Sequence, residues 1–357
     1  MIVHQLLSGA GPHDAVTGQA RAYRALFSRW GWGGEDVAAA LDPRVDGEVR
    51  PLSRLRAADD DVLVFHFSAY APRLRAALDL PGPKLLVSHN VTPARWLWRY
   101  DPGSAVQCAV GRAQLPEFAR RVDLAAGVSA YNAAELKAAG APAVEVLPIL
   151  FDRARLEAAG RPRPSGGRAP VILFVGRLTP HKRQDEVIRA FALYRRLHAP
   201  DAQLVLVGEP QPRGFDVRLR GLAEQLAPGA VTIEGALSPA QLAQRYRRAD
   251  AFLCLSEHEG FLVPLLETFH YGVPVVARAV GGVGEVAGDA ALLLDPDRDK
   301  EPAVVAELLH LAVTDDALRE ELRRRGERRL EHFSHEAVAQ RIRTAVERVA
   351  EIGGARR

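Results

Sequence analysis

The chain has 357 residues, of which 48% are hydrophobic and 25% charged, a balance typical of globular domains and sufficient for two buried cores. Its 47 basic and 44 acidic side chains leave a formal net charge of +3, which is too small to indicate a nucleic-acid partner. No nucleic-acid-binding motif accompanies the basic residues, so we expect none of these partners.

The two cysteines, Cys108 and Cys254, provide no disulfide framework, and neither has a partner at metal-ligand spacing. The first residues, MIVHQLLSGAG, lack the basic start and long apolar run of a signal peptide. No stretch of about 18 apolar residues occurs, so no membrane-spanning helix is predicted. These features predict a protein of the reducing cytoplasm.

The first half of the sequence alternates short apolar runs with helical patterns. Runs typical of strands occupy residues 2–7, 36–40, 62–67, 84–87, 124–128 and 144–147. Helical patterns occupy residues 17–30 and 131–139. This alternation predicts right-handed crossovers and a parallel sheet, so we expect residues 1–152 to form a Rossmann-like domain on the acceptor side.

The composition changes at residues 161–170, RPRPSGGRAP, which show no apolar periodicity. Such a stretch is typical of an interdomain linker, predicted here over residues 153–169. Strand patterns then return at residues 171–175, 203–207, 231–233, 251–255, 273–277 and 291–294. With helical patterns at 184–197 and 239–248, they predict a second doubly wound domain over residues 170–333.

The end of the chain is predicted to be helical. Ser334 is a good N-cap for a last helix from His335 to about Ile352. We treat residues 334–357 as a separate C-terminal element.

The loop after residues 171–175 contains Gly176, Arg177 and Lys182. Loops at the carboxyl edge of a parallel sheet are where ligands bind in such folds. A guanidinium, an ammonium and backbone N–H groups at this edge would suit a diphosphate. The competing interpretation is a surface loop with solvated charges.

The loop after residues 251–255 contains Glu259, Gly260 and Phe261, and Pro264 then suits the first turn of a helix. Carboxylates accept hydrogen bonds from vicinal hydroxyls, so we expect Glu259 to bind a sugar and Glu267 a ribose. Alternatively, Glu267 only satisfies the amino end of its helix. Gly260 permits close approach of a ligand.

A third loop, residues 279–285, reads AVGGVGE. Gly281 and Gly282 can present backbone N–H groups to a sugar or phosphate. A flexible turn is the alternative.

The stretches FVGRLTPHKR, RRADAFLCLSEHEGFLVPLLE, GVPVVA and GGVGEVAGDAALLLDP resemble, in this order, the second domain of glycosyltransferase family 4. The members of this family are retaining enzymes with the GT-B fold, two facing doubly wound Rossmann-like domains and a C-terminal helix that crosses back onto the first. The resemblance covers about residues 171–296. It implies a glycosyltransferase of the hexosyltransferase type with a UDP- or GDP-sugar donor.

The resemblance also implies roles for individual residues. Arg177 and Lys182 would bind the donor diphosphate, Glu259 the transferred sugar and Glu267 the ribose. Further donor contacts would come from Gly176, Gly260, Phe261, Gly281, Gly282 and Val283.

The first domain resembles the family more loosely. The segment SHNVTP after residues 84–87 is similar to the family loop that faces the donor sugar, which implies that His89 bonds a sugar hydroxyl. Gly11, Asp14 and Asn90 would lie on the acceptor side. The glycines of the loop at residues 9–14 depart from the commonest paired form, which affects the acceptor contacts and not the donor site.

These assignments predict front-face transfer, in which the leaving phosphate helps to accept the acceptor's proton. Net retention is implied by the resemblance. No metal and no cofactor are expected, since the nucleotide-sugar is a co-substrate and the cations carry the developing charge. The acceptor is expected to be a sugar, a glycan, a lipid-linked molecule or a small molecule.

Two other functions remain open. A nicotinamide-dependent oxidoreductase would use Gly9 and Gly11 after the first strand, although Asp14 stands where a third glycine belongs. A non-catalytic sugar-nucleotide-binding protein is the second alternative.

One stretch after His89 mixes aromatic and basic residues: Arg95, Trp96, Trp98, Arg99 and Tyr100. These residues either touch a lipid-linked or aromatic acceptor, or the aromatics partly fill the core while the arginines are solvated. Peripheral membrane contact is compatible with the sequence, but no motif requires it.

Overall fold

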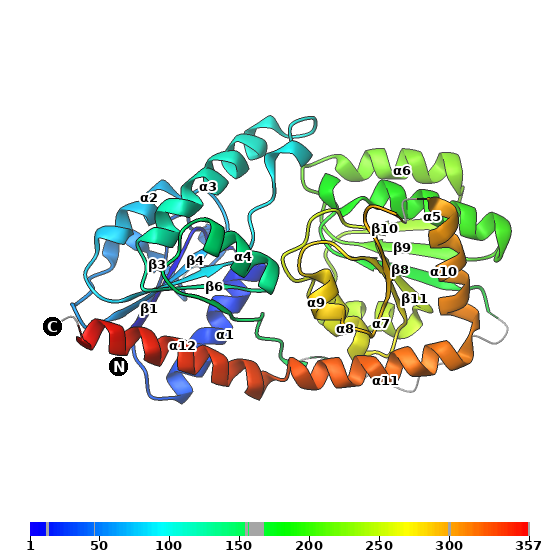
Figure 1. Ribbon diagram of the computed structural model, residues 1–357. Coiled ribbons are helices and arrows are strands. Elements are labelled where there is room, and N and C mark those ends of the chain that lie inside the picture. The colour runs from blue at the N-terminus through cyan, green and yellow to red at the C-terminus, as the bar shows by residue number, and fades with distance from the viewer. Residues whose placement is uncertain (12–13, 46, 154–155, 157–167, 299–300, 356–357) are drawn as a thin grey trace. The chain divides into compact units, whose positions relative to one another are not determined.

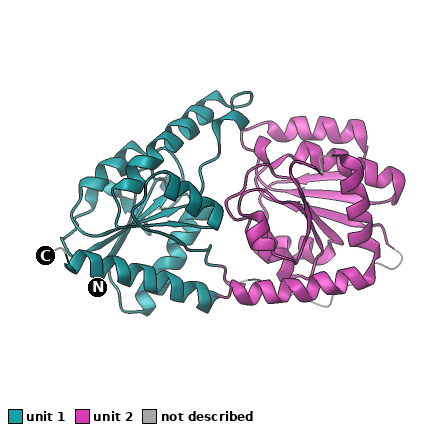
Figure 2. Ribbon diagram, in the orientation of Figure 1, with its two compact units in different colours: residues 1–150, 335–357 teal, residues 151–334 magenta. Residues whose placement is uncertain are grey.

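The computed structural model describes residues 1–11, 14–45, 47–153, 156, 168–298 and 301–355. The chain forms two compact units, residues 1–150 with 335–357, and residues 151–334 (Figure 2). Most of the predicted linker lies outside the described residues.

The first unit contains a parallel seven-stranded sheet in the order β3-β2-β1-β4-β5-β6-β7 (Figure 1). Its strands are β1 (Val3–Leu7), β2 (Asp36–Ala38), β3 (Arg50–Pro51), β4 (Val62–Phe67), β5 (Lys84–Ser88), β6 (Leu124–Gly127) and β7 (Val144–Val146). Its helices are α1 (Ala15–Arg29), α2 (Pro72–Ala76), α3 (Pro102–Arg120), α4 (Ala130–Ala138) and α12 (His335–Ala355). Short 3-10 turns are η1 (Pro43–Val45), η2 (Leu52–Arg54), η3 (Ala77–Asp79) and η4 (Ala94–Trp96).

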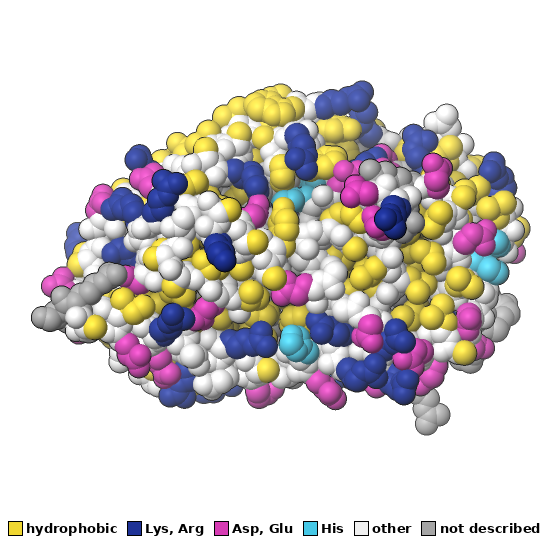
Figure 3. All heavy atoms as spheres, viewed as in Figure 1, with side chains coloured by type: hydrophobic (Ala, Val, Ile, Leu, Met, Phe, Trp, Pro, Cys, Tyr) yellow, Lys and Arg dark blue, Asp and Glu magenta, His cyan; other side chains and the backbone are white. Residues whose placement is uncertain are grey.

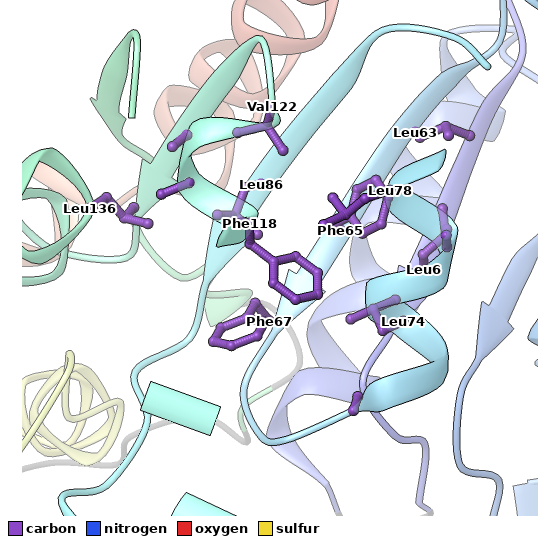
Figure 4. Packing of buried hydrophobic residues seen from close by; sticks show 14 of the residues in the cluster. Leu6, Leu63, Phe65, Phe67, Leu74, Leu78, Leu86, Phe118, Val122 and Leu136 are labelled. Atoms are coloured by element: carbon purple, nitrogen blue, oxygen red, sulfur yellow. The ribbon is translucent and has the colours of Figure 1, made fainter. Parts of the chain in front are cut away.

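Aromatic packing holds α3 on this sheet. Phe118 of α3 lies 4.8 Å from Phe67 and 6.2 Å from Phe65 of β4, measured between ring centroids. Figure 4 shows Phe118 directed toward both rings, with Leu86 and Leu74 nearby. These side chains are fully buried, so the hydrophobic effect fixes the helix against the strands.

The last helix, α12, belongs to the first unit although 184 intervening residues form the second (Figure 2). Its buried residues recur at helical spacing and include Val338, Ile342, Val346 and Val349. This apolar face packs on β4 and β5. The C-terminal element therefore completes the core of the N-terminal unit.

The second unit contains a parallel six-stranded sheet in the order β10-β9-β8-β11-β12-β13. Its strands are β8 (Val171–Val175), β9 (Gln203–Val207), β10 (Val231–Glu234), β11 (Ala251–Cys254), β12 (Val275–Arg278) and β13 (Leu292–Leu294). Its helices are α5 (Gln184–Leu197), α6 (Phe215–Leu226), α7 (Pro239–Arg248), α8 (Pro264–His270), α9 (Val283–Ala287), α10 (Pro302–Thr314) and α11 (Asp316–His332), with the 3-10 turn η6 (Pro180–Lys182).

The expectation of two doubly wound α/β domains is confirmed. The largest difference is α3, for which no helix was predicted; Gly103, Gly111 and Pro116 interrupt its pattern. Strand β12 begins two residues later than expected, because Pro274 has no N–H for the ladder.

The visible surface carries mixed charge. Lys and Arg side chains are interspersed with Asp and Glu over the face drawn in Figure 3. Among the residues that the structure describes, no helix combines the length and apolar character needed to cross a bilayer.

Candidate functional site

The two loops singled out in the second half of the sequence leave the same sheet edge. β8 and β11 are hydrogen-bonded neighbours in the parallel sheet, although about 75 residues separate them in sequence. The carboxyl ends of these two strands therefore lie side by side. The loops are also joined directly, because the N–H of Glu257 donates to the carbonyl of His181 over 2.8 Å.

An ion pair between the two loops forms the centre of this site. Nζ of Lys182 lies 2.6 Å from Oε1 of Glu259, and the two side chains are only 12% and 7% exposed. Removing both charges from water is costly, and their mutual attraction offsets this cost only in a well-formed pair. The predicted phosphate-binding cation and sugar-binding carboxylate are thus in contact with each other.

The glycine loop is fixed to the same carboxylate residue. Gly281 has a φ of +55°, and a Cβ at this position would lie 2.0 Å from the carbonyl oxygen of Glu259. The N–H of Gly282 donates to that oxygen over 3.1 Å. Val283 then begins α9. The Gly-Gly pair therefore allows the third loop to pack against the backbone of Glu259, which a flexible turn would not require.

Arg177 and Lys182 both lie near His181. The buried imidazole has its pKa lowered first by burial and then by the charges of Lys182 and Arg177. Arg177 itself is exposed, and its Nη1 donates to Oε1 of Gln211 over 2.8 Å. The structure thus places one largely buried cation, Lys182, and one exposed cation, Arg177, after the end of β8.

A glycine pair brings the neighbouring loops together. Gly208 follows β9 with a φ of +151°, and a Cβ there would lie 2.0 Å from the carbonyl oxygen of Gly176. Gly176 itself has a φ of +149°. Only glycine tolerates this approach, so both positions fix the backbone beside Arg177.

Glu267 has a different environment from Glu259. Its Oε2 accepts a hydrogen bond of 2.6 Å from the hydroxyl of Tyr246 on α7. Burial raises the pKa of Glu267, and the hydrogen bond from Tyr246 opposes this rise. Phe261, a predicted donor contact, is buried against Phe333, with ring centroids 5.4 Å apart. Its side chain thus contributes to packing.

The raised pKa of Glu267 predicts a specific dependence of stability on pH. In the folded chain the carboxyl of Glu267 stays protonated at pH values above its ordinary pKa of 4.5, at which the unfolded chain has lost the proton. The free energy of unfolding must therefore fall as the pH rises from about 4.5 through the raised pKa. We expect Glu267→Gln to remove this part of the slope in urea unfolding at a series of pH values.

Comparing the wild type with Glu267→Gln separates the contribution of Glu267 to the pH dependence from that of other buried acids. Burial also raises the pKa of Asp250, but that residue titrates in both proteins and cancels in the difference. Identical slopes for the wild type and Glu267→Gln would contradict the assigned environment.

A network of ion pairs that the sequence did not reveal supports these loops. Arg183 has left-handed backbone geometry, with a φ of +51°, and its guanidinium pairs with Glu257 and with Asp185. Arg278 at the end of β12 donates to Oε2 of Glu186 over 2.6 Å and to the carbonyl of Leu255 over 2.8 Å. The pairs with Glu257 and Glu186 could not be inferred from spacing, because they join the start of α5 to the loop after β11 and to the end of β12.

The predicted site residues of the first unit form hydrogen bonds with other residues of that unit. Nε2 of His89 lies 2.9 Å from Nδ1 of His66, and burial lowers the pKa of His89 to about 4. The imidazole is therefore neutral near pH 7. Asn90 has a φ of +69°, and its Oδ1 accepts from Nδ2 of Asn132 over 3.2 Å. Both follow β5 at the carboxyl edge of its sheet.

Asp14 and Gly11 are tied to the start of α1. The carboxylate of Asp14 accepts from the N–H of Thr17 over 2.8 Å, which makes it the N-cap of this helix. The N–H of Gly11 donates to Oγ1 of Thr17 over 3.1 Å. Sequence reasoning assigned both residues to the acceptor and missed this capping role, which the pattern Asp-x-x-Thr before a helix indicates.

The described residues contain no group of three His, Cys, Asp or Glu side chains arranged to hold a metal ion.

Comparison with known proteins identifies the second half of the chain. Residues 160–329 match the family model for glycosyl transferases group 1. A D-inositol 3-phosphate glycosyltransferase of Segniliparus rotundus is 32% identical over 298 residues, which cover 79% of this chain and 63% of that protein. A protein of the same name from Salinispora arenicola is 35% identical over 197 residues, 52% of this chain and 43% of that protein.

The chain thus spans less than two thirds of the length of these curated relatives. Among solved structures, the sucrose-phosphate synthase of Thermosynechococcus elongatus is similar with a TM-score of 0.73 and 16% identity, over 98% of each chain. At this identity the similarity concerns the fold, which is the two-domain GT-B architecture.

Proposed function

We propose that this chain, whose residues 160–329 match the family model for glycosyl transferases group 1, transfers a sugar from a UDP- or GDP-sugar to a hydroxyl acceptor. The donor diphosphate binds at Arg177 and Lys182 in the second unit. The single observation that carries this proposal is the buried ion pair of Lys182 with Glu259 at the carboxyl edge of β8 and β11.

The pair acts as a preformed site that the donor rearranges. A phosphate oxygen competes with Glu259 for the ammonium of Lys182, and each charge-assisted hydrogen bond contributes about 1.5–3 kcal/mol. Glu259 is then able to accept hydrogen bonds from the sugar hydroxyls. Neither charge is left unpaired in either state, which avoids the cost of an isolated buried charge.

Transfer proceeds on the front face of the sugar with net retention. The bond between the anomeric carbon and the phosphate oxygen breaks, and the acceptor oxygen bonds to that carbon. The acceptor's proton passes to the leaving phosphate. Arg177 and Lys182 stabilise the negative charge that develops on this phosphate, and no metal or cofactor takes part in this scheme.

The acceptor is a polyol, a sugar or a glycan, free or lipid-linked. The curated relatives are named for D-inositol 3-phosphate, which makes a phosphorylated polyol the first acceptor to test. In the first unit, neutral His89 bonds a sugar hydroxyl, while Asn90 and the loop of Gly11 and Asp14 contact the acceptor.

The N-cap role of Asp14 disfavours the oxidoreductase alternative. In a dinucleotide fold the amino end of the first helix binds pyrophosphate through free N–H groups. Here the carboxylate of Asp14 already accepts from Thr17 at this position. The N–H group of Thr17 is therefore not free for a pyrophosphate.

A panel of nucleotide-sugars tests the proposed function. A true donor at one hundred times its Kd stabilises the folded protein by about 2.7 kcal/mol, which thermal unfolding detects. We expect one UDP- or GDP-sugar to give this shift, and to release its nucleoside diphosphate when D-inositol 3-phosphate or another polyol acceptor is added. A shift with NADH and none with any nucleotide-sugar would contradict the proposal.

A further inference from the structure

Exposed apolar side chains gather on one face of α3 and the turn before it. On the helix they recur at positions i, i+3, i+4 and i+7, where Val106, Ala109, Val110 and Ala113 are all exposed. Val106 is 48% exposed, while Ala105 and Phe118 of the same helix are fully buried against the core. In Figure 3 hydrophobic side chains cover the part of the surface over α3. We call these four residues and Trp98 the α3 face.

Trp98 extends this face into the turn that precedes the helix. The turn is fixed by buried Leu97, whose carbonyl accepts from the N–H groups of Tyr100 and Asp101. Asp101 in turn caps α3 by accepting from the N–H of Ser104 over 3.0 Å. Trp98 is nevertheless 50% exposed, so half of its surface is available for contact with another molecule.

The charges beside the α3 face that have no ion-pair partner among the described residues are positive. Arg95 and Arg99 are exposed, and neither forms an ion pair with a residue that the structure describes. The two acids that flank residues 102–113 are already engaged, since Asp101 caps α3 and Glu117 pairs with Arg75 over 2.6 Å. By contrast, the arginines of α11 are matched by acids one turn away, as Arg323 is by Glu320 and Glu327. The α3 face thus combines an apolar stripe with unpaired positive charge.

We propose that the α3 face docks this protein on an anionic lipid surface. Tryptophan favours the interface between water and bilayer, and the valines and alanines enter the region between head groups and acyl chains. Arg95 and Arg99 then meet lipid phosphates, which are the acidic partners that the protein does not provide.

A second copy of this chain fits the face less well. A symmetric contact would bring the same positively charged face of two molecules together. Arg95 and Arg99 of each copy would repel those of the other, because the nearby acids Asp101 and Glu117 are already engaged within each copy. An anionic membrane supplies the opposite charge.

Docking by this face has a consequence for the acceptor. The segment from Asn90 to Arg95 runs without interruption from a predicted acceptor residue to the face. A bilayer bound at the α3 face therefore contacts a segment that begins a few residues after the loop that follows β5. A lipid-linked acceptor is therefore favoured among the acceptors of the proposed function, although docking itself does not depend on that function.

Vesicle co-sedimentation of the purified chain tests this proposal without donor or acceptor. We expect binding to phosphatidylcholine vesicles that contain about 30% phosphatidylglycerol, and at least about tenfold weaker binding to pure phosphatidylcholine. Val106→Asp should weaken binding to the anionic vesicles at least about tenfold. The matched control is Val217→Asp on α6, where the valine is 67% exposed but has no place in the α3 face, and it should bind as the wild type does.

Two further variants separate the apolar from the electrostatic contribution to vesicle binding. Trp98→Ala should weaken binding at every salt concentration, whereas Arg95→Glu combined with Arg99→Glu should remove its salt dependence. Absence of wild-type binding, or equal loss in Val106→Asp and Val217→Asp, would overturn the proposal. So would a dimer in vesicle-free sedimentation that Val106→Asp dissociates, because the face would then be a contact between copies.

Discussion

Replacing Lys182 with Met lowers kcat/KM for the donor by about a hundredfold to a thousandfold, because the main buried cation at the leaving phosphate is lost. The side chain of Met fills similar space, so the loop keeps its packing. Turnover is measured with the donor and acceptor that the panel identifies. Lys137→Met on the exposed side of α4 is the matched control and should retain wild-type turnover.

Lys182→Met also lowers the free energy of unfolding, because the carboxylate of Glu259 stays buried without the ammonium that lies 2.6 Å away in the wild type. Breaking a buried pair on one side costs about 3–5 kcal/mol. The double variant Lys182→Met with Glu259→Gln removes the unpaired charge, so it should regain most of the stability in urea unfolding without regaining turnover. Turnover of Lys182→Met within about threefold of the wild type would remove Lys182 from the mechanism.

Replacing Gly281 with Ala displaces the glycine loop from Glu259. The new Cβ would lie 2.0 Å from the carbonyl oxygen of Glu259, and the left-handed φ of +55° adds strain of its own. We expect a loss of about 2 kcal/mol or more in the free energy of unfolding. Because Gly282 would no longer hold the Glu259 backbone, KM for the donor should rise at least about tenfold.

Gly284, three residues further, provides the matched control. It lies inside α9, and a Cβ there would meet nothing within 4 Å. Gly284→Ala should therefore leave stability unchanged or raise it by about 0.4–1 kcal/mol through the unfolded state. Equal unfolding free energies and equal donor KM values for the two variants would show that the loop does not depend on this approach.

Much of the second unit follows from local sequence patterns. The apolar runs at Val171–Val175 and Gln203–Val207 coincide with β8 and β9, because continuous apolar residues suit a strand covered on both faces. Helices α5 and α7 also begin and end where their periodicity predicts. The observed boundaries of strands differ from the predicted ones where a single residue overrides the pattern, as Pro274 does before β12.

The contacts of the candidate site could not be predicted in the same way. Lys182 and Glu259 meet because β8 lies beside β11, a pairing that skips two intervening strands of the sequence. Spacing indicated the residue types and the sheet edge but not the ion pair. The exposure of Trp98 could not be predicted for a related reason, since it depends on what packs above a turn and not on the hydrophobicity of the turn itself.

The most direct test of the account is a calorimetric titration of UDP and GDP into the wild type and into Lys182→Met. The account predicts that one nucleoside diphosphate binds the wild type with a Kd in the micromolar range, and that the substitution weakens this affinity at least about tenfold, equal to about 1.4 kcal/mol. Equal affinity in both proteins, or no binding of either nucleotide to the wild type, would show that the buried pair at the end of β8 is not a diphosphate site.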